Sequence, residues 1–106
     1  MSKPMFTDDT GDSKPKVLIV DDNEGNVIAM QAVLEDLDIE ILTATLAERA
    51  IYLAIVHDLA LIIMDVHMPD MDGFETAERI RQSERSKHVP IMFVTGVKRS
   101  KEEVAR

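Results

Sequence analysis

Residues 59–73 read LALIIMDVHMPDMDG, and this stretch carries most of the information about the fold. Its first part, residues 59–64, is an unbroken apolar run that ends at Asp65. A short run of this kind is typical of a strand that is buried on both faces, as in parallel sheets. Pro69 and Gly73 indicate irregular backbone in the second part. The stretch therefore predicts a buried strand followed by a polar loop, with an acidic residue where the strand ends.

Three other apolar runs predict further strands, at residues 17–20, 39–44 and 91–94. Between the runs, apolar residues recur at the spacing of amphipathic helices. Strands that alternate with helices form βαβ units, and their connections place helices on both faces of a parallel sheet. The sequence therefore predicts an α/β fold with an open parallel sheet.

The helices are predicted to begin at polar capping residues. Asn23 and Thr45 are residue types that favour helix N-caps, and Ser100 with Glu103 matches a capping box. The helical spacing in the first helix is that of Val27, Met30, Val33, Leu34 and Leu37. In the second helix we expect four residues to face inward: Leu46, Ala50, Leu53 and Ala54. The third helix continues through Phe74, Ala77 and Ile80.

The composition is that of one globular domain with an excess of acidic residues. The chain has 106 residues, 45% of them apolar and 30% charged, and 20 acids against 12 bases give a net charge of −8. This length suits a single domain, which we place at residues 16–106 after a flexible polar leader at 1–15. Because the chain has no cysteine, a disulfide scaffold, a thiolate metal site and a cysteine nucleophile are excluded.

Charge and hydropathy also narrow the expected location and partners. The acidic excess argues against direct nucleic-acid binding by this domain. No apolar run approaches the ~18 residues of a membrane span, and the polar start does not match a secretory signal. We therefore expect a cytoplasmic protein that acts without a membrane.

Acidic and hydroxyl residues follow three of the predicted strands. Asp21 and Asp22 follow residues 17–20, Asp65 follows residues 59–64, and Thr95 follows residues 91–94. The carboxyl ends of parallel strands meet at one edge, where open α/β sheets bind their ligands. Converging carboxylates favour a cation, and oxygen ligands without cysteine favour Mg²⁺. The plainer alternative is that each acid only caps a helix or forms a turn.

Three motifs resemble the receiver domain of bacterial two-component response regulators. They are VLIVDDNEGN, LIIMDVHMPDMDGFE and PIMFVTG, in the same order and at similar spacing, and the resemblance covers residues 16–106. It implies a CheY-like, flavodoxin-like fold with strand order 2-1-3-4-5. It also implies a signalling module of a phosphorelay, which catalyses at most its own phosphorylation and dephosphorylation.

The resemblance implies a role for each residue of the site. Asp65 would accept a phosphoryl group from a histidine kinase or a phosphotransfer protein. Asp22 would bind Mg²⁺ directly, Asp21 would help to hold it, and the backbone carbonyl of His67 would complete the protein ligands. Thr95 would act as the switch residue, and an effector domain in the parent protein would receive the signal.

The sequence departs from the family pattern at its end. It stops at Arg106 inside the expected fourth helix, so the fifth strand with its lysine and the fifth helix are missing from this chain. Residues 91–94 would then form an unpaired apolar edge, through which we expect self-association. The missing lysine leaves open an interaction or dimerisation module without phosphotransfer. A phosphohydrolase is disfavoured, because such enzymes need an acid at the position that His67 occupies.

Overall fold

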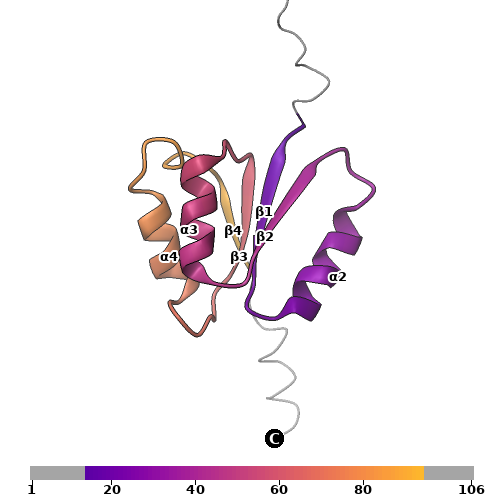
Figure 1. The fold of residues 1–106 in the computed structure, drawn as a ribbon, viewed down its shortest axis with the longest axis horizontal. Helices are drawn as coiled ribbons and strands as arrows, with labels where there is room; N and C mark the ends of the chain where they lie inside the picture. Colours follow the sequence, from indigo (N-terminus) through magenta and orange to yellow (C-terminus); the bar gives the residue numbers. More distant parts are fainter. Residues whose placement is uncertain (1–13, 95–106) are drawn as a thin grey trace, which may run out of the picture.

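The computed structural model describes residues 14–94, which form one open sheet flanked by helices (Figure 1). The strands are all parallel and lie in the order β2-β1-β3-β4. This is the order that the resemblance implied for the first four strands. In chain order the elements are β1 (Lys16–Val20), α2 (Glu24–Leu34), β2 (Glu40–Ala44), α3 (Ala47–Val56), β3 (Leu61–Asp65), α4 (Gly73–Ile80) and β4 (Ile91–Val94).

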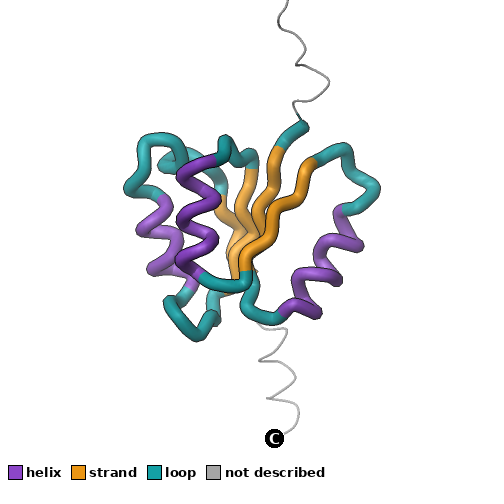
Figure 2. The backbone as a smooth tube through the Cα atoms, viewed as in Figure 1, coloured by secondary structure: helices purple, strands orange, loops and turns teal. Residues whose placement is uncertain are grey.

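The helices divide between the two faces of the sheet. α3 and α4 cover one face and α2 lies on the other (Figure 1, Figure 2). Side chains alternate between the faces along a strand, so Ile62 and Met64 pack toward α3 and α4 while Ile63 faces α2. The main core therefore lies on the side of α3 and α4. Its members are Leu18, Val20, Ala44, Ala47, Ala50, Leu53, Ala54, Leu59, Ile62, Met64, Met68, Ile80 and Val89.

The strand predictions are confirmed, with shifts at the ends. β1 and β4 agree with the predicted runs to within one residue. β2 begins at Glu40 and β3 at Leu61, and Leu59, which precedes β3, packs into the core. Asp65 is the last residue of β3 and pairs with Val94 of β4, so the acid belongs to the strand itself.

The start of α3 differs from the prediction. Thr45 is not its cap: Leu46 occupies the N-cap position, and its side chain makes no capping hydrogen bond. The backbone N–H of Ala47 instead donates to Oδ2 of Asp70 at 2.9 Å. Asp70 lies 23 residues further along the chain, so no local pattern could indicate this cap.

Other helix predictions are partly confirmed. Asn23 caps α2 as predicted, because its side chain accepts a hydrogen bond from the N–H of Asn26. Val33 and Leu46 are exposed, however, and Leu37 lies beyond the end of α2. Helical spacing predicts which residues share a face of a helix, but not how far a neighbouring element covers that face.

Some predictions lie outside the described residues. These are nearly all of the leader, Thr95, and the helix expected after Ser100. None of the helices within residues 14–94 has the length and apolar character that a bilayer crossing requires.

Gly73 begins α4 where the backbone of the preceding loop comes very close. Its N–H donates to the carbonyl oxygen of Val66 at 2.7 Å. A Cβ atom at this position would overlap the carbonyl oxygen of Asp65 and lie 2.9 Å from Cα of Val66. Both obstacles are backbone atoms, so a larger residue would have to displace the end of β3.

We expect Gly73→Ala to lower the free energy of unfolding by about 2 kcal/mol, because the added methyl group overpacks against fixed backbone. Chemical denaturation measures this change. Gly25→Ala is the matched control, since its Cβ would meet one side-chain atom, Oδ1 of the capping Asn23 at 3.0 Å, and no backbone atom. The control should be neutral or stabilising by up to about 1 kcal/mol, the helix preference of alanine over glycine. Equal losses in the two variants would contradict the steric explanation.

One side of β4 has no strand partner within residues 14–94. Met92 and Phe93 are 53% and 38% exposed on this strand. The ring of Phe93 packs against Phe74 of α4, with ring centroids 4.7 Å apart, but both rings remain partly open to solvent. An exposed apolar edge of this kind is a template for pairing with another chain.

We expect the 106-residue chain to self-associate through the β4 edge at micromolar concentrations. Met92→Lys should shift the equilibrium toward the monomer, because a charged residue blocks edge-to-edge pairing. Ile28→Lys is the control, since Ile28 is exposed on α2, away from this edge. Sedimentation velocity measures the species. A compact monomer for the unmodified chain would refute the hypothesis.

Candidate functional site

Three acidic residues meet at the carboxyl edge of the sheet. Asp21 and Asp22 directly follow β1, and Asp65 ends the neighbouring strand β3. Because the two strands are parallel and paired, their ends coincide. Carboxylate oxygens of the three residues lie within 4.8 Å of one another, with Asp65 buried and the other two half-buried. The structure thus brings together three of the residues that the sequence singled out.

Asp21 is held by the start of α2. Its Oδ1 accepts a hydrogen bond from the backbone N–H of Asn23 at 2.9 Å. The side-chain amide of Asn26 lies 3.3 Å from Oδ2 and donates toward the same carboxylate. The N–H of Asp21 itself donates to the carbonyl oxygen of Ala44 at the end of β2. The start of α2 thus orients the carboxylate, and the backbone bond to β2 holds the residue itself in place.

Asp65 is fixed by its own loop. The residue is only 5% exposed, and its Oδ1 accepts a hydrogen bond from the backbone N–H of His67 at 3.3 Å. On the other side, the N–H of Val66 donates to the carbonyl oxygen of Val94. The carboxylate therefore lies at the inner end of the acidic cluster, next to the end of β4.

The loop at residues 66–72 connects β3 to α4 and is anchored along its length. Met68 is buried in the core. Asp70 accepts from the N–H of Ala47 and thereby caps α3. Asp72 caps α4 by accepting from the N–H of Glu75 at 2.8 Å. Local sequence predicted this loop but not the Asp70 cap, because only the packing of α3 against the loop creates it.

An apolar groove lies beside the acidic residues, on the α2 face of the sheet. Its volume is about 190 Å³. The acidic end is formed by Asp21 and Asp65. The rest is formed by α2 and strand side chains, among them Ile19, Ala29, Met30, Val33, Ile63 and Val94.

The donor set suits a hard divalent cation. Three carboxylates close together repel one another unless a positive charge offsets them. Mg²⁺ prefers oxygen ligands, uses one or two carboxylates and keeps several waters, which a half-open site allows. The spread of 4.8 Å between the oxygens fits direct binding by some carboxylates and water-mediated contact by others. The residues present therefore fit Mg²⁺.

Sequence comparison finds the family described as the response regulator receiver domain over residues 17–106. A relative is the sensor histidine kinase GacS of Pseudomonas protegens, 38% identical over 84 residues, which cover 76% of this chain and 9% of the kinase. Another is the response regulator PleD of Caulobacter vibrioides, 34% identical over 83 residues, which cover 77% of this chain and 18% of PleD. The chain thus spans only a small part of these curated relatives.

Solved structures agree with the sequence comparison. The chemotaxis protein CheY4 of Vibrio cholerae superposes with a TM-score of 0.73 and 31% identity, covering 88% of this chain and 80% of that one. The receiver domain of a sensor histidine kinase of Pseudomonas aeruginosa gives a TM-score of 0.74 and 26% identity, covering 85% and 75%. The predicted flavodoxin-like fold is confirmed, and the chain belongs to the response regulator receiver domain family of two-component signalling.

Proposed function

We propose that this domain is a phosphoacceptor, in which Asp65 takes a phosphoryl group from a histidine kinase or a phosphotransfer protein. The convergence of three carboxylates around the end of β3 carries the proposal. A structural cap or turn would need one acid, whereas this edge gathers three in a chain that belongs to the receiver family. The domain then acts as a signalling module and not as an enzyme with turnover.

The cation of the proposed site is Mg²⁺. Asp22 and Asp65 would bind the ion, and the half-buried Asp21 would help to hold it. The backbone carbonyl of His67 would add a neutral ligand. When bound, Mg²⁺ would neutralise the charge that develops on the transferring phosphoryl oxygens. Two related structures support this choice. The Pseudomonas aeruginosa receiver is described with a magnesium ion in its active site cleft, and the Thermotoga maritima regulator TrrA, 26% identical, with Mg²⁺ and BeF.

Asp65 is the group placed to accept the phosphoryl group. One of its carboxylate oxygens would bond to phosphorus while the bond from phosphorus to the donor imidazole nitrogen breaks. The imidazole keeps the electron pair of that bond and takes up a proton, and an acyl phosphate forms on Asp65. Burial of Asp65 to 5% exposure and its position at a strand end hold the acceptor oxygen in one place.

Thr95 is the proposed switch residue. Val94 pairs with Asp65 in the β3–β4 register, and Thr95 follows Val94 in the sequence. A hydroxyl at this place could hydrogen-bond a phosphoryl oxygen on Asp65. This hydrogen bond would then favour a second conformation of the chain after β4, which a partner would recognise.

The context of the domain follows from its relatives. GacS and PleD are longer proteins, named as a sensor kinase and a response regulator. We infer a cytoplasmic phosphorelay with an effector or kinase portion in the parent protein. The exposed β4 edge favours a second candidate, a dimerisation module without phosphotransfer.

Mg²⁺ binding tests the metal half of the site. Asp22→Ala should raise the Mg²⁺ dissociation constant by at least about tenfold. The increase should be larger than in Asp21→Ala, because Asp22 is the proposed direct ligand. Isothermal titration calorimetry with magnesium chloride measures both. Asp36→Ala is the control, since it removes an equal charge from the exposed segment after α2. Unchanged affinity in Asp22→Ala would refute the proposed metal site.

Phosphorylation tests the acceptor. After incubation with acetyl phosphate and Mg²⁺, intact mass spectrometry should show one added phosphoryl group on a version continued through a fifth strand with a lysine. Asp65→Asn should abolish the gain because the amide is not a nucleophile, whereas Asp36→Asn should keep it. A gain that persists in Asp65→Asn would overturn the assignment.

A further inference from the structure

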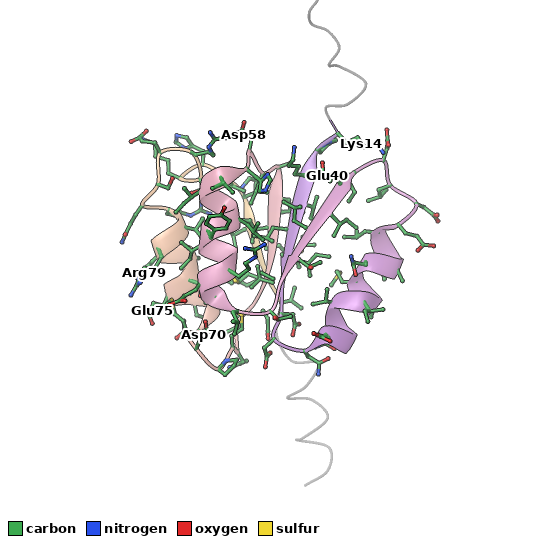
Figure 3. The ribbon with its side chains drawn as sticks, in the orientation of Figure 1. Lys14, Glu40, Asp58, Asp70, Glu75 and Arg79 are labelled. Carbon is green, nitrogen blue, oxygen red and sulfur yellow. The ribbon has the colours of Figure 1, made fainter. Side chains whose placement is uncertain are left out.

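Asp70 joins the loop after β3 to a helix from an earlier part of the chain. Its Oδ2 accepts a hydrogen bond from the backbone N–H of Ala47 at 2.9 Å, and the two residues are 23 positions apart. Figure 3 labels Asp70 in the turn beneath the first residues of α3. The bond is therefore a tertiary contact and not part of a local turn.

α3 depends on this contact because its own sequence provides no cap. The first N–H groups of a helix have no partner within the helix. At the N-cap, Leu46 has an apolar side chain that cannot accept a hydrogen bond. Ala47 is completely buried, so water is a poor substitute for a protein acceptor. The carboxylate of Asp70 fills this role and also complements the positive end of the helix dipole.

The same contact adds a hydrogen bond to α3 on the side where Met68 already packs into the core. The Gly73–Val66 hydrogen bond and the Asp72 cap connect the loop to β3 and α4. The Asp70 bond connects it to α3. His67 lies between the first of these anchors and Asp70, in the part of the loop that follows the acceptor strand.

We propose that Asp70 is a positioning residue for the cation site. It holds residues 66–70 against α3, so that the backbone carbonyl of His67 stays within reach of a cation bound by the three aspartates. This inference rests on the proposed function, because it concerns the same Mg²⁺ site. Coupling between two contacts is reciprocal, so Mg²⁺ binding should also strengthen the bond between Asp70 and Ala47.

The first test compares Mg²⁺ affinities by isothermal titration calorimetry. Asp70→Ala should weaken binding about tenfold, the usual effect of removing a partner that orients a metal ligand. Asp70→Asn should bind within about twofold of the unmodified chain, because asparagine caps helices as well as aspartate does. Two controls are matched to Asp70→Ala. Asp36→Ala removes the same charge from the segment after α2, and Val89→Ala loosens the core just before β4. Both should keep their affinity.

The second test follows the Ala47 amide, which reports the contact directly. Its hydrogen exchange should be slow in the unmodified chain and in Asp70→Asn, and fast in Asp70→Ala. Saturating Mg²⁺ should slow this exchange further in the unmodified chain but not in Asp70→Ala. A cap with only a structural role would protect Ala47 without any response to Mg²⁺, and that result would overturn the inference.

The outcomes separate this inference from the function on which it rests. If Mg²⁺ binding is absent, or is insensitive to Asp22→Ala, the proposed metal site itself fails. If Mg²⁺ binds and depends on Asp22 while a folded Asp70→Ala binds equally well, only the positioning role fails. Circular dichroism establishes that each variant is folded. Weak binding in both Asp70→Asn and Asp70→Ala would also overturn the inference, because charge and not the cap would then be responsible.

Discussion

The parallel pairing of β1 with β3 is the constraint on which the site depends. Both strands are apolar over residues 17–20 and 61–64, and in register they end together. After residues 20 and 64 the sequence changes abruptly from apolar to acidic. The pairing that forms the core thus forces Asp21, Asp22 and Asp65 into one small volume. These carboxylates repel one another, and a bound cation would offset that repulsion.

Much of this arrangement could be predicted from local sequence. Apolar runs that end at an acid predicted β1 and β3, and Asn23 predicted the start of α2. Both signals act over a few residues: a buried strand needs continuous apolar side chains, and a cap needs an acceptor within one turn. The convergence of the acids followed from topology alone, because every parallel strand ends at the same edge.

The parts that could not be predicted depend on contacts between distant segments. Thr45 had the right chemistry for a cap, but the acceptor for α3 comes from Asp70 in another loop. Leu46 had the right spacing to face inward, yet it precedes the helix and is exposed. Propensity and periodicity describe one element at a time. Only the packed structure shows which neighbour supplies a bond or covers a face.

The close approach at Gly73 also determines how the surface of this protein can vary. Surface loops usually accept insertions and changes of length. The loop at 66–72 is different, because the Gly73–Val66 hydrogen bond joins its ends and both of its capping aspartates have fixed partners. One inserted residue would break several of these contacts at once. Insertions, whether natural or engineered, are better tolerated in the exposed segment between α2 and β2. This segment lies at the amino ends of the strands, opposite the acidic site.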